Sequence, residues 1–258
     1  MHEAARRNFA DGLNLLVDYG ALLDIEDGKG DTPLHLAAWE GHSTACEKLI
    51  SNGASVDRLS GRDGLSPLWC AVLNKHVELV RLLLSHGAST QVRSPAEMYL
   101  IHQASVTAQL EICKLLLDHG ADVNCTDKEL NTALHYAATS GSIDMADLLI
   151  QHGADVDARQ EAGLTALHWA AHKGNREIIT LLVDAGANVN ALSKTAATPL
   201  HCAASAGRQK CTKLLLKNGA NPNVKTDDWD GRQGLPLELA KRNGHKQIVA
   251  MLGYYEKK

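Results

Sequence analysis

Histidine is the residue type in this sequence with the most obvious chemistry to offer, because thirteen of its 258 residues are histidines. His168 and His172 are four positions apart, and on a helix that spacing places two imidazoles on one face, as in a two-histidine zinc pair. No third ligand at a recognisable spacing accompanies them. Residues 28–32 (Gly-Lys-Gly-Asp-Thr) resemble a phosphate-binding loop, yet the first glycine and the preceding strand are missing. The sequence therefore predicts no metal, no nucleotide and no other cofactor.

The remaining histidines recur within a unit of sequence that is repeated along the chain. A landmark of the form Thr-Pro-Leu-His, or a variant of it, begins at residues 32, 66, 99, 132, 165, 198 and 235. The steps between these positions are 34, 33, 33, 33, 33 and 37 residues, and Met1-His2 lies one step before Leu34-His35. All histidines except His172 fall at recurring places in this unit, so their recurrence indicates a structural role. No arrangement of serine, cysteine, histidine and acid predicts a nucleophile, and we expect no enzyme activity.

Each repeat predicts two short helices and a turn-rich finger. After the landmark, small pairs such as Ala137-Ala138 allow a first helix to pack closely, and a turn leads to a second helix with apolar residues at helical spacing. The second helix stops at a glycine, at residues 20, 53, 87, 120, 153, 186 and 219. Glycine adopts the left-handed conformation after a helix without strain. Because one repeat cannot bury its own apolar face, neighbouring repeats must stack.

The landmark and its period resemble the ankyrin repeat, and the resemblance extends from one end of the chain to the other. It implies an all-α solenoid of stacked helix-turn-helix units with β-hairpin or turn fingers, in a single domain at 1–258. The repeats are expected at approximately 1–25, 26–59, 60–92, 93–125, 126–158, 159–191, 192–224 and 225–258. The family also implies that the landmark histidine joins neighbouring repeats through hydrogen bonds.

The same resemblance implies a non-catalytic protein–protein interaction module, a scaffold that binds a partner protein or peptide on its concave face. The alternative is the substrate-recognition arm of a larger multidomain enzyme, such as a ubiquitin ligase receptor. The net charge of −4 provides no basic stripe for nucleic acid. No apolar run approaches the roughly 20 residues that cross a bilayer, and the N-terminus lacks the apolar core of a signal peptide. We therefore expect a monomer in the cytoplasm, with the nucleus as the alternative, and six reduced cysteines.

The partner is expected to contact variable residues at the end of each first helix and in each finger. Trp39 is the strongest candidate, since an aromatic side chain on the surface suits an interface anchor; alternatively, its ring lies flat over the neighbouring finger. Leu65, Leu73 and Met98 would continue an apolar track from Trp39. Further variable positions occur in every repeat, on the inner helices from Arg6 and Arg7 to Arg242 and Asn243. In the fingers they include Lys29, Asp31, Lys128, Glu129, Asn131, Glu161, Leu164 and Lys194, and His172 is one of those on the helices. The predicted partner-binding residues are Trp39, Glu40, Arg62, Asp63, Leu65, Leu73, Asn74, Met98 and Trp229.

Two asparagines and one degenerate repeat complete the predictions. Asn124 and Asn190 each follow a valine, with a leucine eight residues upstream, a pattern that resembles the target of an oxygen-sensing asparaginyl hydroxylase. Alternatively, these asparagines merely close the turn. In the fourth repeat Glu97 and Ala108 replace glycines, which predicts either an irregular finger or simple drift. Because the chain begins inside a landmark, we expect a domain excised from a longer protein, with a very small protein as the alternative.

Overall fold

The computed structural model describes residues 1–61, 63–226 and 234–255. In this part of the chain it contains sixteen α-helices and no strand. The fingers are turns, with two isolated β-bridges, Arg93 with Tyr99 and Thr226 with Gly234. The all-α prediction is confirmed. The chain divides into two compact units, Met1–Asp122 (unit 1) and Val123–Lys258 (unit 2), and each is described by itself, so a single continuous domain stays a prediction.

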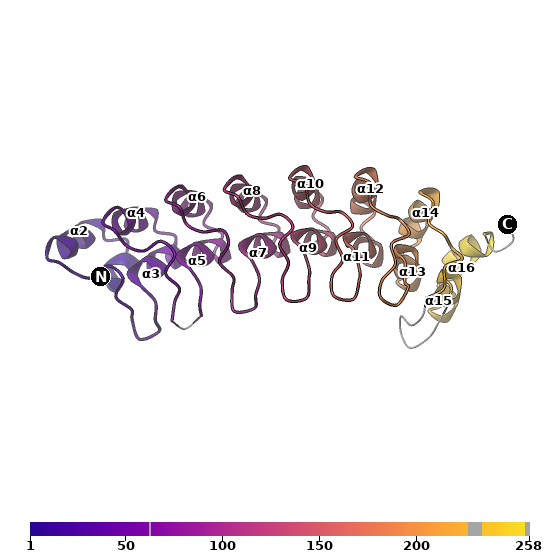
Figure 1. Cartoon of the computed structure of the whole chain (residues 1–258), viewed down its shortest axis with the longest axis horizontal. Coiled ribbons are helices and arrows are strands. Elements are labelled where there is room, and N and C mark those ends of the chain that lie inside the picture. Colours follow the sequence, from indigo (N-terminus) through magenta and orange to yellow (C-terminus); the bar gives the residue numbers. More distant parts are fainter. Residues whose placement is uncertain (62, 227–233, 256–258) are drawn as a thin grey trace. The chain divides into compact units, whose positions relative to one another are not determined.

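Unit 1 is a stack of four helix pairs. It consists of α1 (His2–Arg6), α2 (Ala10–Asp18), α3 (Pro33–Glu40), α4 (Ser43–Ser51), α5 (Pro67–Leu73), α6 (Val77–Ser85), α7 (Leu100–Val106) and α8 (Leu110–Asp118). Each odd-numbered helix packs on the next odd-numbered helix, and each even-numbered helix packs on the next even-numbered one. Figure 1 shows these as two rows, with the fingers projecting beyond the odd-numbered row. We call the odd-numbered helices inner and the even-numbered ones outer.

Unit 2 repeats this arrangement. It consists of α9 (Ala133–Ser140), α10 (Ile143–Gln151), α11 (Ala166–Lys173), α12 (Arg176–Asp184), α13 (Pro199–Ser205), α14 (Gln209–Lys217), α15 (Pro236–Arg242) and α16 (Lys246–Gly253). Inner helices again pack on inner helices and outer on outer. In both units one helix pair falls within each predicted repeat range, because the helix signals and the turns recur at the same places in the sequence.

The landmark begins each inner helix and also joins it to the next repeat. In unit 2 the backbone N–H of Thr165 donates to Nδ1 of His168 at 3.1 Å, so the ring proton lies on Nε2, which donates to the carbonyl oxygen of Ala197 at 3.0 Å. His35 bonds Leu65 in the same way at 2.9 Å, and His135 and His201 bond Leu164 and Gly234 at 3.1 and 3.3 Å. The predicted role of the landmark histidine is confirmed.

Glycines end the outer helices as predicted. The seven stop glycines have φ between 75° and 98°, a region that other residues enter at a cost. The fourth repeat keeps the backbone of its neighbours in spite of its substitutions, since Glu97 has φ 58° where Gly64 has 59°, and Ala108 has φ 53°. Drift within an unchanged backbone therefore describes this repeat better than an irregular finger.

The core of each unit is a thin layer of small and branched residues. Alanine pairs on the inner helices, such as Ala137 and Ala138, have no exposed surface. Trp69 takes the landmark position of a histidine, is 2% exposed, and donates from Nε1 to the carbonyl oxygen of Val92 at 3.0 Å. It thus keeps the buried packing of the residue it replaces and still donates a hydrogen bond into the next repeat, but to an earlier carbonyl group than the histidines use. Five of the six cysteines are buried thiols and Cys125 is half-buried.

Candidate functional site

Neighbouring fingers are joined by backbone hydrogen bonds near their tips. In unit 1 the N–H of Gly61 donates to Gly30, and in unit 2 the N–H of Glu161 donates to Glu129 and that of Lys194 to Ala162, at 2.8 to 2.9 Å. These bonds join two neighbouring fingers in unit 1 and three neighbouring fingers in unit 2. The fingers and the inner helices together form the surface on which the sequence places the candidate residues.

In the loop that resembles a phosphate-binding site, two backbone N–H groups already donate hydrogen bonds to the neighbouring side chain of Asp27. Oδ1 of Asp27 accepts the backbone N–H groups of Lys29 and Asp31 at 2.8 and 3.0 Å. These hydrogen bonds, that of Asp31 foremost, lower the pKa of the Asp27 carboxyl group. A carboxylate therefore occupies the place where a phosphate would have to be held.

The predicted apolar track lies along the inner helices and fingers of unit 1. Trp39 and Glu40 end α3, with Trp39 48% exposed, and Leu73 ends α5 with Asn74 after it. Because α3 packs on α5, Trp39 and Leu73 lie on adjacent repeats. The carbonyl oxygen of Trp39 also accepts a hydrogen bond from Nε2 of His76 at 3.0 Å, so its backbone is fixed while its ring faces solvent.

The other members of the track are less accessible than Trp39. Leu65 and Met98 precede the first residue of the landmark in consecutive repeats, and both are half-buried. The backbone of Leu65 serves packing, since its carbonyl oxygen accepts the His35 hydrogen bond. Asp63 is exposed. Arg62 and Trp229 lie outside the described residues.

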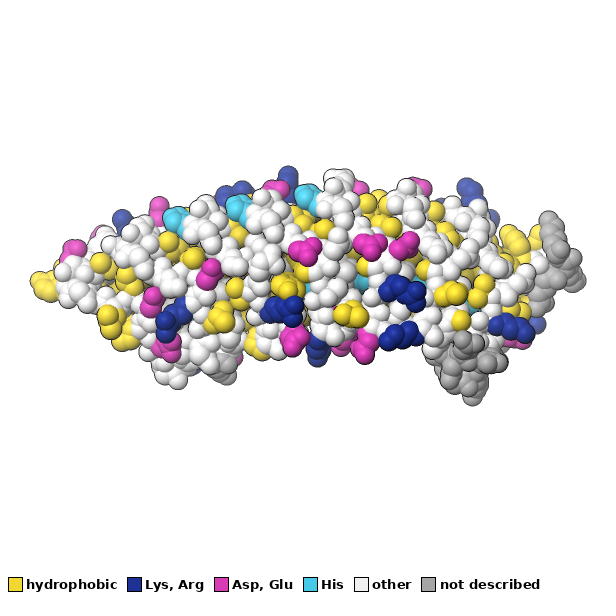
Figure 2. Space-filling model, in the orientation of Figure 1, with side chains coloured by type: hydrophobic (Ala, Val, Ile, Leu, Met, Phe, Trp, Pro, Cys, Tyr) yellow, Lys and Arg dark blue, Asp and Glu magenta, His cyan; other side chains and the backbone are white. Residues whose placement is uncertain are grey.

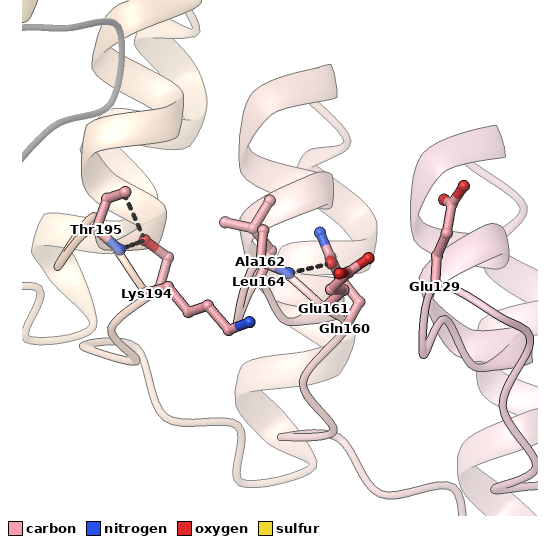
Figure 3. A pocket seen from close by; sticks show the side chains of 8 residues that line it. Glu129, Gln160, Glu161, Ala162, Leu164, Lys194 and Thr195 are labelled. Atoms are coloured by element: carbon pink, nitrogen blue, oxygen red, sulfur yellow. Dashed lines mark hydrogen bonds between the residues drawn. The ribbon is translucent and has the colours of Figure 1, made fainter.

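Three adjacent fingers of unit 2 surround a pocket of about 640 Å³, which we call the finger pocket. Its lining comprises Glu129, Gln160, Glu161, Ala162, Leu164, Ser193, Lys194 and Thr195. Figure 3 shows the Lys194 side chain extending toward the neighbouring finger, on which Gln160 and Leu164 lie. Oε1 of Gln160 accepts the N–H of Ala162 at 2.6 Å, and Oγ of Ser193 accepts that of Thr195 at 3.2 Å. The pocket thus has a fixed backbone wall with two carboxylates and one ammonium group.

A smaller pocket of about 160 Å³, the inner pocket, continues from Leu164 between the inner helices. It is lined by Leu164, His168, Trp169, His172 and Cys202. The ring of His172 lies edge-on to that of Trp169, and its Nδ1 is covered by protein atoms without a hydrogen-bond partner among the described residues. Burial, followed by the charges of Lys173 and Arg208, lowers the pKa of His172. A neutral imidazole on an apolar wall can accept one hydrogen bond from an incoming group.

The two histidines of the inner pocket do not form a zinc pair. Nδ1 of His168 accepts the Thr165 N–H, and Nε2 donates to Ala197, so both nitrogens are already used. Among the described residues no group of three or more histidine, cysteine or acidic side chains could hold a metal ion. His172 is therefore better interpreted as a polar contact in an apolar recess.

Comparison with models of known protein families shows to which family this chain belongs. The family model described as ankyrin repeats (3 copies) matches residues 1–94, 90–160, 156–226 and 194–258. The chain belongs to the ankyrin-repeat family. Ankyrin repeats are generally protein-interaction modules without catalytic activity.

Curated ankyrin-repeat relatives match shorter stretches of the chain. SMC5-SMC6 complex localization factor protein 1 of Bos taurus is 38% identical over 88 residues, which is 34% of this chain and 8% of the relative. Ankyrin repeat and SOCS box protein 9 of Mus musculus is 33% identical over 94 residues, 36% of this chain and 32% of the relative. B-cell lymphoma 3 protein homolog of Mus musculus is 35% identical over 83 residues, 32% of this chain and 18% of the relative. The match thus spans at most about a third of these relatives.

The ankyrin-repeat surface combines charges of both signs with apolar side chains. Figure 2 shows acidic and basic side chains interspersed on the face that it presents. In the described residues no helix is long and apolar enough to cross a membrane. The sequence pattern identified Leu164, Lys194 and His172 as variable positions. It gave no sign that they line two pockets that share Leu164, because that depends on how side chains of neighbouring repeats meet.

Proposed function

We propose that this chain binds a segment of a partner protein along its fingers and inner helices, and that it is a recognition module without catalytic activity of its own. The observation that carries the proposal is the buried, unpartnered Nδ1 of His172 in the inner pocket. An unsatisfied buried ring nitrogen is unfavourable, and a ligand group in the pocket that hydrogen-bonds to it, as the imidazole turns toward the ligand, removes that cost. The pocket volume of about 160 Å³ suits one side chain with an apolar body and a hydroxyl or N–H group.

The finger pocket suits the adjoining part of the same segment. Glu129 and Glu161 lie on one side of it and Lys194 extends into it from the other (Figure 3). A peptide that carries a basic residue beside an acidic or polar one would be complementary to these charges. Anchoring by one buried side chain with a polar rim is the usual distribution of binding energy in protein interfaces.

The Trp39 track of unit 1 is proposed as a second contact surface. An exposed tryptophan on a fixed backbone can be buried by a partner with little loss of conformational freedom, and truncating such an anchor typically costs about 2 kcal/mol or more. Glu40, Asp63 and Asn74 would provide its polar rim, as would Arg62, while Trp229 would be a separate contact.

Peptides selected from a phage-displayed random library against the whole chain test the proposal, with their affinities measured by fluorescence anisotropy. His172→Leu removes the acceptor but keeps the recess apolar, and it should weaken the selected peptides about tenfold. Lys194→Glu leaves only carboxylates as charged groups in the finger pocket and should select peptides without the acidic residue. Trp39→Ala tests the unit 1 track separately. As a control, Lys114→Glu on the outer helix α8 should have no effect. Peptides that bind His172→Leu, Lys194→Glu and Trp39→Ala as tightly as wild type would refute the proposal.

The alternative, in which the repeats are the substrate-recognition arm of a larger enzyme, uses the same surface. It is consistent with the 33% identity to an ankyrin repeat and SOCS box protein. The partner segment would then be a substrate. Mass spectrometry of proteins that copurify with the full-length gene product tests this, since the alternative requires ligase subunits that remain bound when His172→Leu and Trp39→Ala release the substrate.

A further inference from the structure

The sequence of unit 2 contains a long stretch of one charge sign. Residues 185–226 include no aspartate or glutamate, although the whole chain has a net charge of −4. The six cations of this stretch are Lys194, Arg208, Lys210, Lys213, Lys217 and Lys225. Three of them lie on the outer helix α14, away from the inner-helix surface of the proposed function.

These three lysines line a pocket of about 510 Å³, which we call the basic pocket. Its lining is Arg176 of α12, Lys210, Lys213, Leu214 and Lys217 of α14, and Tyr255 after α16. The helices α12 and α16 both pack on α14. Within the described part of the chain, none of the four cations forms an ion pair. In unit 1, by contrast, Arg81 of the outer helix α6 bonds Glu111 of the next outer helix at 3.1 Å.

The charges of α14 oppose the pattern of the other outer helices. The second helical residue is acidic in five of them, at Asp11, Glu78, Glu111, Asp144 and Glu177, and Lys210 takes this place in α14. A cation in the first turn interacts unfavourably with the positive end of the helix dipole. The spacing of Lys210, Lys213 and Lys217 adds repulsion between like charges three and four residues apart. No described carboxylate forms an ion pair with these lysines, so their charges are open to an external anion.

We propose that the basic pocket binds an acidic peptide segment of a partner protein. Lys210 and Lys217 are separated by roughly 10 Å along the helix axis, about the length of three extended residues. The exposed ammonium groups act as mobile point charges that accept carboxylates in several geometries. Leu214 and Tyr255 lie between and beside the cations, so they can contact apolar side chains between the acidic ones. Because the site is on outer helices, it is independent of the inner-helix proposal.

A peptide fits better than nucleic acid. The cations are confined to one pocket, and the chain as a whole is negatively charged, so a long polyanion would be repelled beyond the pocket. A short acidic segment meets the positive surface alone.

The test uses a fluorescein-labelled peptide of sequence Asp-Asp-Leu-Asp-Asp-Leu-Asp-Asp, with a peptide in which asparagine replaces aspartate as its neutral control. Anisotropy titrations of the full chain at low salt should show binding of the acidic peptide alone, weakened as salt screens the charges. Lys213→Glu should weaken binding about tenfold or more. Lys114→Glu is the matched control, because Lys114 takes the same position in α8 and the charge change is identical; it should bind as wild type does.

Lys210→Glu separates a binding role from a structural one. It should weaken peptide binding and also raise the melting temperature, because it restores an acidic residue in the first turn and removes repulsion from Lys213. Absence of binding at low salt would overturn the proposal, as would equal losses in Lys213→Glu and Lys114→Glu. Binding of single-stranded DNA or phosphatidylserine vesicles tighter than that of the peptide, and lost in Lys213→Glu, would overturn it in favour of a different ligand.

Discussion

Lowering the pH from 7.5 to 5.5 should destabilise unit 2, because two of its histidines fit their sites as neutral imidazoles. His168 and His201 are 1% and 0% exposed. In each ring Nδ1 accepts the N–H of the landmark threonine and Nε2 donates to a carbonyl oxygen of the next repeat. A protonated Nδ1 would have to point its own hydrogen at that N–H. Burial lowers the pKa of both histidines to about 4.

The magnitude follows from the difference between folded and unfolded pKa values. An unfolded histidine has a pKa of about 6.5. Between that value and about 4 the unfolded chain binds protons that the folded chain does not, so the free energy of unfolding falls as the pH falls. The free energy of unfolding that the two neutral histidines contribute is fully present above about pH 6.5 and is lost by about pH 4. At pH 5.5 the loss is roughly 1.3 kcal/mol for each histidine, or about 2.5 kcal/mol for the pair.

Urea unfolding followed by circular dichroism at the two pH values measures this loss. At pH 5.5 ordinary carboxyl groups remain largely ionised, so the histidines dominate the difference. His168→Gln and His201→Gln should each lower stability at pH 7.5 and each remove about 1.3 kcal/mol of the pH-dependent part. If the double variant His168→Gln/His201→Gln keeps the full pH dependence of wild type, the reasoning about the landmark is wrong.

Four further predictions concern individual side chains. Glu97→Gly should raise the free energy of unfolding by about 1 kcal/mol in a urea titration, because φ at Glu97 is 58°; a lower stability would contradict this. Asn124→Ala should lower it by about 1 to 2 kcal/mol, since Asn124 donates to Gly153 at 3.1 Å and accepts from Asp155 at 2.8 Å. Peptide mass spectrometry of protein from animal cells should show one added oxygen on Asn124 or Asn190, and complete coverage without it would end the hydroxylation hypothesis. Native alkylation should modify the half-buried Cys125 well before Cys202, whose pKa burial raises to about 12.

The fold could be predicted because each of its structural features favours a particular residue type, and that residue type recurs with the period of the repeat. The stop glycines mark positive φ, the alanine pairs mark close packing, and the landmark marks a helix start. Even the substitution of Trp69 was interpretable, because the position and not the residue type specifies burial. Glu97 shows the limit of such marks: it suggested a change in conformation, whereas neighbouring repeats held the backbone at φ 58°.

One position whose side chain joins neighbouring repeats recurs in the sequence, but its pattern was not interpreted as a link between repeats. Asp57, Asp157 and Asn190, one repeat period or a multiple apart, each accept the backbone N–H of a residue in the next repeat, at 2.7 to 2.9 Å. Asn190 also donates to the carbonyl oxygen of Gly219 at 3.0 Å. The recurrence of Asp or Asn at this place is the signal for the bridge, and the turn-closing interpretation understated it.

The surfaces could be predicted only as positions, since a pocket depends on side chains from different repeats. Trp39, Leu73 and His172 hold the same place, seven residues after the landmark begins. The first is 48% exposed and the second half-buried, while Nδ1 of the third is buried without a partner among the described residues. The sequence showed that this place varies. Which variant opens a recess depends on Leu164 and Trp169, whose contacts no single repeat encodes.

Some residues destabilise the unbound chain locally although the packing of the repeats does not require them, and these residues are the most informative about function. An exposed Trp39, a buried acceptor on His172 and a cation in the first turn at Lys210 are each unfavourable in the free chain. At the places of His172 and Lys210 most other repeats carry residues without that cost, and at the place of Trp39 only Val106, 44% exposed, resembles it. Each cost is removed by a different kind of contact: an apolar surface, a hydrogen-bond donor and an anion. The three residues therefore indicate three chemically distinct contacts, which can be tested one at a time.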